Sequence, residues 1–159
     1  MNSLRTAILQ QALSNGETID LNSILKQLQG MAIGVWRRQQ DSLVLLQFTH
    51  DGTLTQEVAT GFQQATAQVS LSQADLGIVA AVLRGEPAPA LVVPNPDLPG
   101  SASWLERFGS RMSLSWPVFQ SEEQTGQAAI VGVLAIAYAE PLSENDQPWQ
   151  LLNAALPVM

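Results

Sequence analysis

Residues 128–139 read AAIVGVLAIAYA and form the longest apolar run of the chain. A membrane-spanning helix needs about 20 apolar residues, so this run is too short to cross a bilayer as a helix. Its side chains are apolar at both odd and even positions, as in a strand that is covered on both faces of a sheet. The run therefore predicts a buried central strand over residues 128–138.

The segment before this strand alternates with a period of two, which predicts another strand over residues 111–119. Arg111, Ser113 and Ser115 share one face of it. The opposite face carries the apolar side chains of Met112, Leu114, Trp116 and Val118. Residues 121–127 are polar and read as the turn of a hairpin between the two strands.

More strands are expected toward the N-terminus. Residues 31–37 and 42–49 are rich in Val, Ile, Leu, Phe and Trp, which favours a pair of strands. The sequence HDG at residues 50–52 reads as a turn, because Asp-Gly supplies the positive φ that a tight turn needs. Weaker alternation indicates a further strand over residues 53–60, and a short strand is expected over residues 90–93.

Two helices are expected between these strands. The first carries an apolar stripe at helical spacing, made of Leu76, Val79, Ala80 and Leu83. Ser72 and Asp75 precede it with the spacing of a capping box. The second follows a proline-rich loop at residues 94–100, where Ser101 is expected to cap a short helix that carries Trp104, Leu105 and Phe108.

Helices are also expected at both ends of the chain. The first has apolar residues at helical spacing, namely Leu4, Ile8 and Ala12. The second begins after an N-cap at Asp20, ends at Gly30 and carries the stripe Leu21, Ile24, Leu25 and Leu28. The last is capped by Ser143 and carries Trp149, Leu152 and Leu156. Such faces can pack on the sheet, and they can also serve a dimer interface.

The composition is that of one folded domain. The chain has 159 residues, of which 46% are apolar and 13% are charged, and it shows no internal repeat and no linker. We therefore expect a single domain over residues 1–159. It divides into N-terminal helices over 1–30, a sheet core with inserted helices over 31–140 and an exit helix over 141–159.

Charge and cysteine content exclude several classes of function. The formal net charge of −7 disfavours binding to nucleic acid and to anionic membranes, since like charges repel. The chain has no cysteine, which excludes disulfides, thiolate metal sites and a cysteine nucleophile. No secretion signal is evident at the start, so a cytoplasmic location is expected.

The order of elements and several local motifs resemble the GAF domain family. Residues 76–87 (LGIVAAVLRGEP) look like the family's helix that ends in Gly and a polar-Pro turn, and residues 90–94 look like the strand and loop after it. Residues 113–118 (SLSWPV) and 131–134 (VGVL) resemble the family's closing hairpin. The resemblance covers residues 20–156, nearly the whole chain.

The resemblance implies an α+β fold built on an antiparallel sheet of about six strands, with the PAS fold as runner-up. Terminal helices would cover one face, and a pocket would lie between the other face and the middle helices. Such domains sit in larger signal-transduction proteins, including sensor histidine kinases of two-component systems. The implied function is a sensory or regulatory domain, the N-terminal part of such a protein, that binds an unidentified small molecule or forms a homodimer through its terminal helices. The alternative is a ligand-free dimerisation or protein-docking module.

Departures from the family's patterns narrow the choice of ligand. Bilin chromophores attach through cysteine, and the GAF-type free methionine sulfoxide reductases use cysteine, so a covalent bilin and that activity are excluded. The NKFDE motif of cyclic-nucleotide-binding members is absent. Haem-binding members supply a proximal histidine, but the sole histidine, His50, lies in the expected turn without further metal ligands. The ligand or cofactor therefore stays unknown.

The candidates for contacting a ligand are Trp104, Phe108, Arg111, Ser113 and Ser115. The two aromatic residues lie one turn apart in a region that borders the pocket in the family, where they can form a lid or simply pack in the core. If the face shared by Arg111 and the serines lines the pocket, the guanidinium can bind an anionic group, and if it faces water the three are ordinary solvated residues. No positioned Ser-His-Asp set is evident, so no catalytic or metal-binding residue is assigned and the segment is not expected to be an enzyme.

Overall fold

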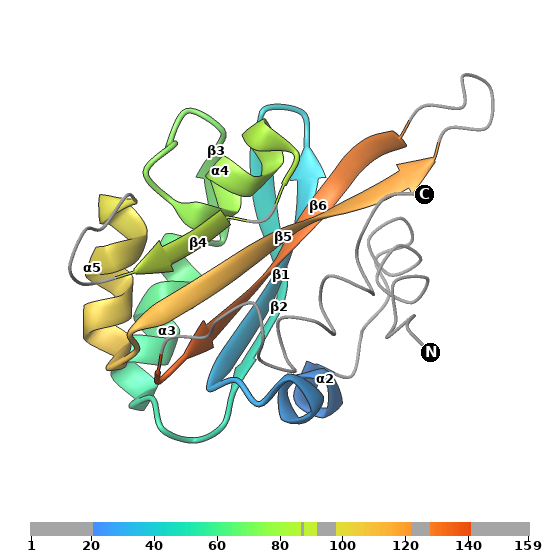
Figure 1. Cartoon of the computed structure of the whole chain (residues 1–159). Helices are drawn as coiled ribbons and strands as arrows, with labels where there is room; N and C mark the ends of the chain where they lie inside the picture. Colours follow the sequence, from blue (N-terminus) through green and yellow to red (C-terminus); the bar gives the residue numbers. More distant parts are fainter. Residues whose placement is uncertain (1–20, 87, 92–97, 122–127, 141–159) are drawn as a thin grey trace.

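The computed structural model describes residues 21–86, 88–91, 98–121 and 128–140 (Figure 1). Its elements, in chain order, are α2 (Leu21–Leu28), β1 (Ala32–Gln39), β2 (Ser42–His50), α3 (Gln56–Ala65), β3 (Gln68–Ser70), α4 (Gly77–Arg84), β4 (Ala88–Leu91), α5 (Pro99–Phe108), β5 (Met112–Ser121) and β6 (Ala128–Tyr138). The helices expected before residue 21 and after residue 140, the N-cap at Asp20 and most of the proline-rich loop lie outside the described residues.

The strands form one six-stranded sheet in the order β3-β2-β1-β6-β5-β4, and all neighbours are antiparallel. The hairpins β1–β2 and β5–β6 are joined side by side through the pairing of β1 with β6. The apolar run at residues 128–139 forms the central strand β6, which has the predicted bounds. The expected α+β class and the six-stranded antiparallel sheet are therefore confirmed.

One face of the sheet packs against α2, and Figure 1 shows α3, α4 and α5 on the other face. The α2 face has a continuous apolar core because the alternating side chains of β5 and β6 meet the apolar stripe of the helix. The phenol of Tyr138 closes this layer by donating a 3.0 Å hydrogen bond to the carbonyl oxygen of Leu28. The end of α2 is thereby fixed to the end of β6.

Helix α2 ends at Leu28, and its stop differs in detail from the expectation. Gln29 adopts the left-handed conformation (φ 58°), while Gly30 donates its N–H to the carbonyl of Leu25. Gly30 is required for a different reason, since a Cβ atom there would lie 2.5 Å from Cγ2 of Ile136. The glycine therefore lets the chain pass close to β6.

The strand expected over residues 53–60 is wrong, because this segment starts helix α3. Thr55 is its N-cap and accepts a 3.2 Å hydrogen bond from the N–H of Val58. Val58, Ala59 and Phe62 then face the sheet at helical spacing. A strand does follow, but it is the short β3 over Gln68–Ser70.

The expected caps of α4 and α5 are also wrong. Leu76 is the N-cap of α4 and makes no side-chain hydrogen bond there, so Ser72 and Asp75 do not form a capping box. Ser101 lies inside α5, whose N-cap is Leu98. Its hydroxyl accepts a hydrogen bond from the N–H of Gly77 and so caps α4 instead of its own helix.

None of the helices that the structure describes is long and apolar enough to cross a membrane. Within the same residues, no group of three or more His, Asp or Glu side chains lies together in a way that could hold a metal ion.

Candidate ligand-binding site

A small cavity lies between the sheet and the helices α3, α4 and α5. Its volume is about 60 Å³. Its lining comes mostly from β1, β5 and β6 on the sheet side and from the three helices on the other side. The pocket implied by the family resemblance, between the sheet and the middle helices, thus has a counterpart in the structure.

The floor of the cavity follows one cross-strand row of residues. Phe48 of β2 is paired with Gly34 of β1, which is paired with Ala135 of β6, which is paired with Ser115 of β5. The two middle residues have little or no side chain; the indole of Trp36 takes the space above Gly34, and Ala135 leaves room beside it. Three strand spacings of about 4.8 Å separate Phe48 from Ser115, roughly 14 Å in all. The floor therefore has an aromatic end and a hydroxyl end.

Trp36 forms the wall beside this floor, and the position of its ring requires a glycine at residue 34. A Cβ atom on Gly34 would lie 2.6 Å from the Trp36 ring, so the indole covers the glycine directly. The indole Nε1–H donates a 3.0 Å hydrogen bond to the carbonyl of Thr66 at the end of α3. The ring is almost completely buried and held at both its face and its polar atom.

Phe62 of α3 is the centre of the aromatic part of the site. Its ring meets Trp104 and Phe108 of α5 edge to face, at centroid distances of 5.2 and 5.0 Å. It also contacts Phe48 at 5.2 Å and Trp36 at 6.1 Å. Edge-to-face geometry is the favourable arrangement for such pairs. One half-buried side chain thus joins α3 to α5 and to the sheet.

The hydroxyl groups of Ser101, Ser113 and Ser115 also line the cavity. The hydroxyl of Ser101 is occupied by the N–H of Gly77 at 2.7 Å. Ser115 is only 1% exposed, and its hydroxyl makes no hydrogen bond to another described residue. It fits beside α4 because Gly77 lacks a side chain, since a Cβ there would lie 3.1 Å from Ser115 Oγ. A buried hydroxyl without a partner inside a cavity is a candidate ligand contact.

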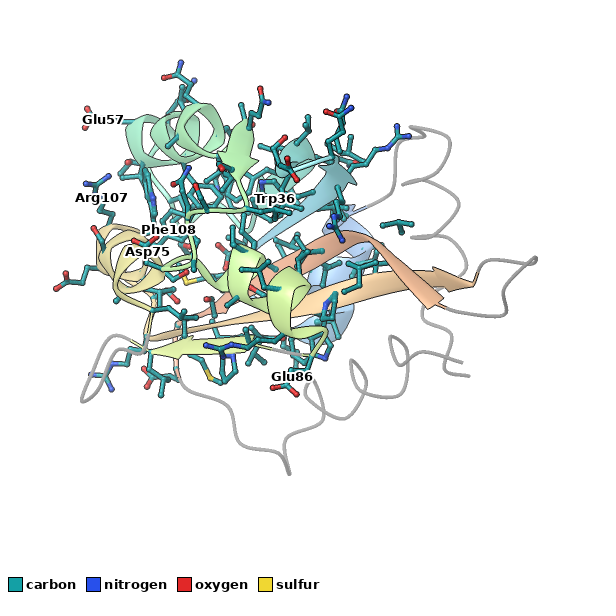
Figure 2. The ribbon with its side chains drawn as sticks, turned by 90° about the horizontal axis from the view of Figure 1, so that it is seen from above. Trp36, Glu57, Asp75, Glu86, Arg107 and Phe108 are labelled. Atoms are coloured by element: carbon teal, nitrogen blue, oxygen red, sulfur yellow. The ribbon has the colours of Figure 1, made fainter. Side chains whose placement is uncertain are left out.

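Charged groups lie outside the cavity. Arg111, expected on the same face as the two serines of β5, does not line it and stands just before β5 with a side chain that is 67% exposed. Its guanidinium lies 3.6 Å from the carboxylate of Glu140. The guanidinium carbon of Arg107 lies over the ring of Trp104, 4.5 Å from its centroid. Figure 2 shows Arg107 and Glu57 pointing away from the sheet, while Trp36 and Phe108 lie between the sheet and the helices.

The structure therefore brings together Trp104, Phe108, Ser113 and Ser115, and it separates Arg111 from them. His50 is also outside the lining, and its Nδ1 accepts a hydrogen bond from the N–H of Gly52 in the expected turn. The sequence reading missed Phe62, because it took the segment before it for a strand. The signal available was the cap at Thr55 followed by apolar residues at helical spacing.

By sequence, the chain matches no family model and no curated protein. Solved structures, however, share its fold over most of their length. The GAF domain of a two-component sensor histidine kinase from Bacillus halodurans has a TM-score of 0.58 at 12% identity, covering 86% of this chain and 85% of that one. The phycoerythrobilin-bound GAF domain from a cyanobacterial phytochrome has a TM-score of 0.60 at 13% identity, covering 94% and 84%.

A third similar structure is an enzyme. The type II free methionine-R-sulfoxide reductase from Thermoplasma acidophilum has a TM-score of 0.55 at 14% identity, covering 93% of this chain and 97% of that one. Together these likenesses show that the chain has the fold of GAF domains, as the local motifs indicated. Identities this low define the fold alone, and one fold hosts many activities.

Proposed function

We propose that the chain is a sensory or regulatory GAF domain of a signal-transduction protein and binds a small molecule in the cavity under α3, α4 and α5. The observation that carries the proposal is the buried hydroxyl of Ser115, which faces this cavity without a hydrogen-bond partner among the described residues. An unpaired buried hydroxyl costs about 1–3 kcal/mol, which a ligand that supplies the partner recovers.

In this proposal, the ligand acts by shifting a population of conformations. Helices α3 and α5 meet through Phe62, Trp104 and Phe108, so an occupant of the cavity that displaces these rings changes how the two helices sit on the sheet. A connected output domain, such as a histidine kinase, would respond to the difference. The segment itself would be non-catalytic and cytoplasmic, and homodimers would form through its terminal helices.

A second candidate function is a ligand-free dimerisation or docking module. The size of the cavity favours it, because about 60 Å³ is far below the roughly 300–1,000 Å³ of typical ligand sites. Under this alternative, the aromatic rings are permanent core packing.

The test is to isolate the protein from its native host and identify any small molecule that is released on denaturation by mass. The matched control is Ala135→Leu, because Ala135 is half-buried on the cavity floor and a larger side chain there fills the space. Sensing predicts a molecule of defined mass with the natural chain and none with the folded variant. The same content in both proteins would favour the docking module.

A further inference from the structure

We infer that the cavity binds a compact, uncharged molecule with a single aromatic ring and one hydrogen-bonding group. Ser115 binds this group, and the ring of Phe62 moves to make room for the ligand. The inference rests on the proposed ligand-binding function and names the class of ligand. Four features of the site lead to it, namely its charge, its walls, its hydroxyls and its size.

The charge of the site excludes ions. None of the described residues that line the cavity is charged. The guanidinium of Arg107 lies over the ring of Trp104 and that of Arg111 lies beside Glu140, and neither lines the cavity. Moving an ionised group into an apolar site without a partner is strongly unfavourable. The ligand is therefore neutral when bound.

The walls favour a flat ring. Ala135 has a short side chain, the indole of Trp36 covers Gly34 beside it, and the rings of Phe48 and Phe62 line the same cavity. Aromatic rings attract one another in offset or edge-to-face contacts. A planar ligand lying on this floor would make such contacts with its neighbours, whereas a branched aliphatic chain would not.

The hydroxyls fix the orientation of the ligand. Ser115 lies at the opposite end of the floor from Phe48, and Ser113 lies two residues away on the same strand. A ring that lies over Ala135, the cross-strand partner of Ser115, therefore directs a substituent toward this hydroxyl. A hydroxyl or N–H group on the ligand would satisfy the buried hydroxyl of Ser115 and add a preference over an apolar substituent.

The size of the cavity requires one side chain to move. An engineered apolar cavity of about 150 Å³ binds benzene, whereas this one measures about 60 Å³. Trp36 is held by a hydrogen bond to Thr66, whereas Phe62 is half-buried and has no polar group to hold its ring. Its helix α3 buries only Ala59 completely. The proposal therefore assigns the movement to Phe62, which lines the cavity from a helix with little buried surface.

The experiment uses the whole chain and the probes toluene, phenol and benzoate, which share one ring and differ in polarity and charge. Binding is measured by calorimetry to the natural chain and to Phe62→Ala, which removes a phenyl ring from the wall. Phe62→Ala is expected to bind toluene and phenol at least about tenfold more tightly than the natural chain. Benzoate is expected to bind neither protein.

The second step adds Ser115→Ala to Phe62→Ala. We expect the affinity for phenol to fall roughly three- to tenfold, the value of one hydrogen bond, while the affinity for toluene is maintained. The matched control is Ser103→Ala, an exposed serine on α5 that should change neither affinity. If Phe62→Ala does not fold, Phe62→Leu opens a smaller space and carries the same comparison.

Each outcome decides the inference. Tight binding of benzoate overturns the argument from charge, and an equal loss of toluene and phenol with Ser115→Ala overturns the role of that hydroxyl. If no probe binds but a native molecule is released from the chain, the ligand class is wrong and the proposed function stands. If no probe binds and no native molecule is released, the proposed function fails as well.

Discussion

The hydroxyl of Ser101 in α5 accepts a 2.7 Å hydrogen bond from the N–H of Gly77, the first residue of α4. The start of one helix is therefore capped by a residue from the next helix, 24 positions along the chain. This contact holds together two of the three helices that cover the cavity. Its loss would leave the first turn of α4 without a side-chain cap, because the N-cap residue Leu76 provides none.

Ser101→Ala should lower the free energy of unfolding by about 1 kcal/mol, the usual value of a lost N-cap. The measurement is unfolding in urea, monitored by circular dichroism. Ser103→Ala, at an exposed position of the same helix, is the control and should change stability by less than about 0.5 kcal/mol. Equal effects of both variants would show that the hydrogen bond to Gly77 has no net value.

Two glycine substitutions should change the free energy of unfolding in opposite directions. Gly34→Ala places a Cβ within 2.6 Å of the Trp36 ring, so overpacking should cost about 1–3 kcal/mol. Gly61→Ala, inside α3 with open space around the added atom, should stabilise the protein by about 0.5–1 kcal/mol through helix propensity.

Thermal and urea unfolding of both glycine variants measure these two changes in stability. A shift in tryptophan fluorescence is expected for Gly34→Ala alone, because only there must the indole of Trp36 move. A neutral Gly34→Ala with unchanged fluorescence would contradict the close contact between the glycine and the ring.

Stability should fall at alkaline pH because of Tyr138. Burial raises the pKa of its phenol above the usual value of 10.0, so the folded state keeps the proton that the unfolded state releases. Below the unfolded pKa the phenol is protonated in both states. As the pH rises past it, stability declines by about 1.4 kcal/mol per pH unit until the phenol ionises in the folded state too.

Tyr138 is the single tyrosine of the chain, so the absorbance of tyrosinate reports on this residue alone. The folded protein should develop this absorbance only above the pH at which the unfolded protein does. Tyr138→Phe should remove the corresponding part of the alkaline slope, and it should cost about 1–3 kcal/mol near neutral pH because the carbonyl of Leu28 loses its donor. Titration at the same pH in both states would contradict the prediction.

Gln40→Gly should stabilise the hairpin between β1 and β2. Gln40 adopts a positive φ of 57° in the turn, which costs a residue with a side chain about 1–2 kcal/mol. Glycine avoids this cost but adds freedom to the unfolded chain, so the expected gain is about 0.5–1 kcal/mol. Gln39→Gly, at the last residue of β1, is the control and should destabilise the protein.

The strands were the most predictable part of the fold. Residues 112–118 of β5 alternate with a period of two, and β6 is apolar on both faces, as expected for a covered central strand. The start of α3 was misread because residues 53–60 contain few apolar residues and its helical period becomes visible only when Phe62 is included. Local patterns also could not predict the cap of α4, since Ser101 reaches Gly77 only in the folded chain.

The candidate site was predictable where it follows a strand and not where it depends on distant neighbours. Ser113 and Ser115 line the cavity because the period of β5 places them on one face. The same period does not place Arg111 in the lining, because Arg111 precedes the first residue of β5. Its charge is solvated beside Glu140. Nothing local links Phe62 to Trp36, although they form one wall of the site.

The sheet also limits how copies of this domain can associate. Its two outermost strands are the three-residue β3 and the four-residue β4, and β4 contains Pro89, which lacks an N–H group. Short edge strands of this kind offer a neighbouring chain few free backbone donors and acceptors. A continuous sheet that runs through two molecules is therefore disfavoured. An assembly of this domain would instead be built from side-chain surfaces, which selection can strengthen or weaken without altering the sheet.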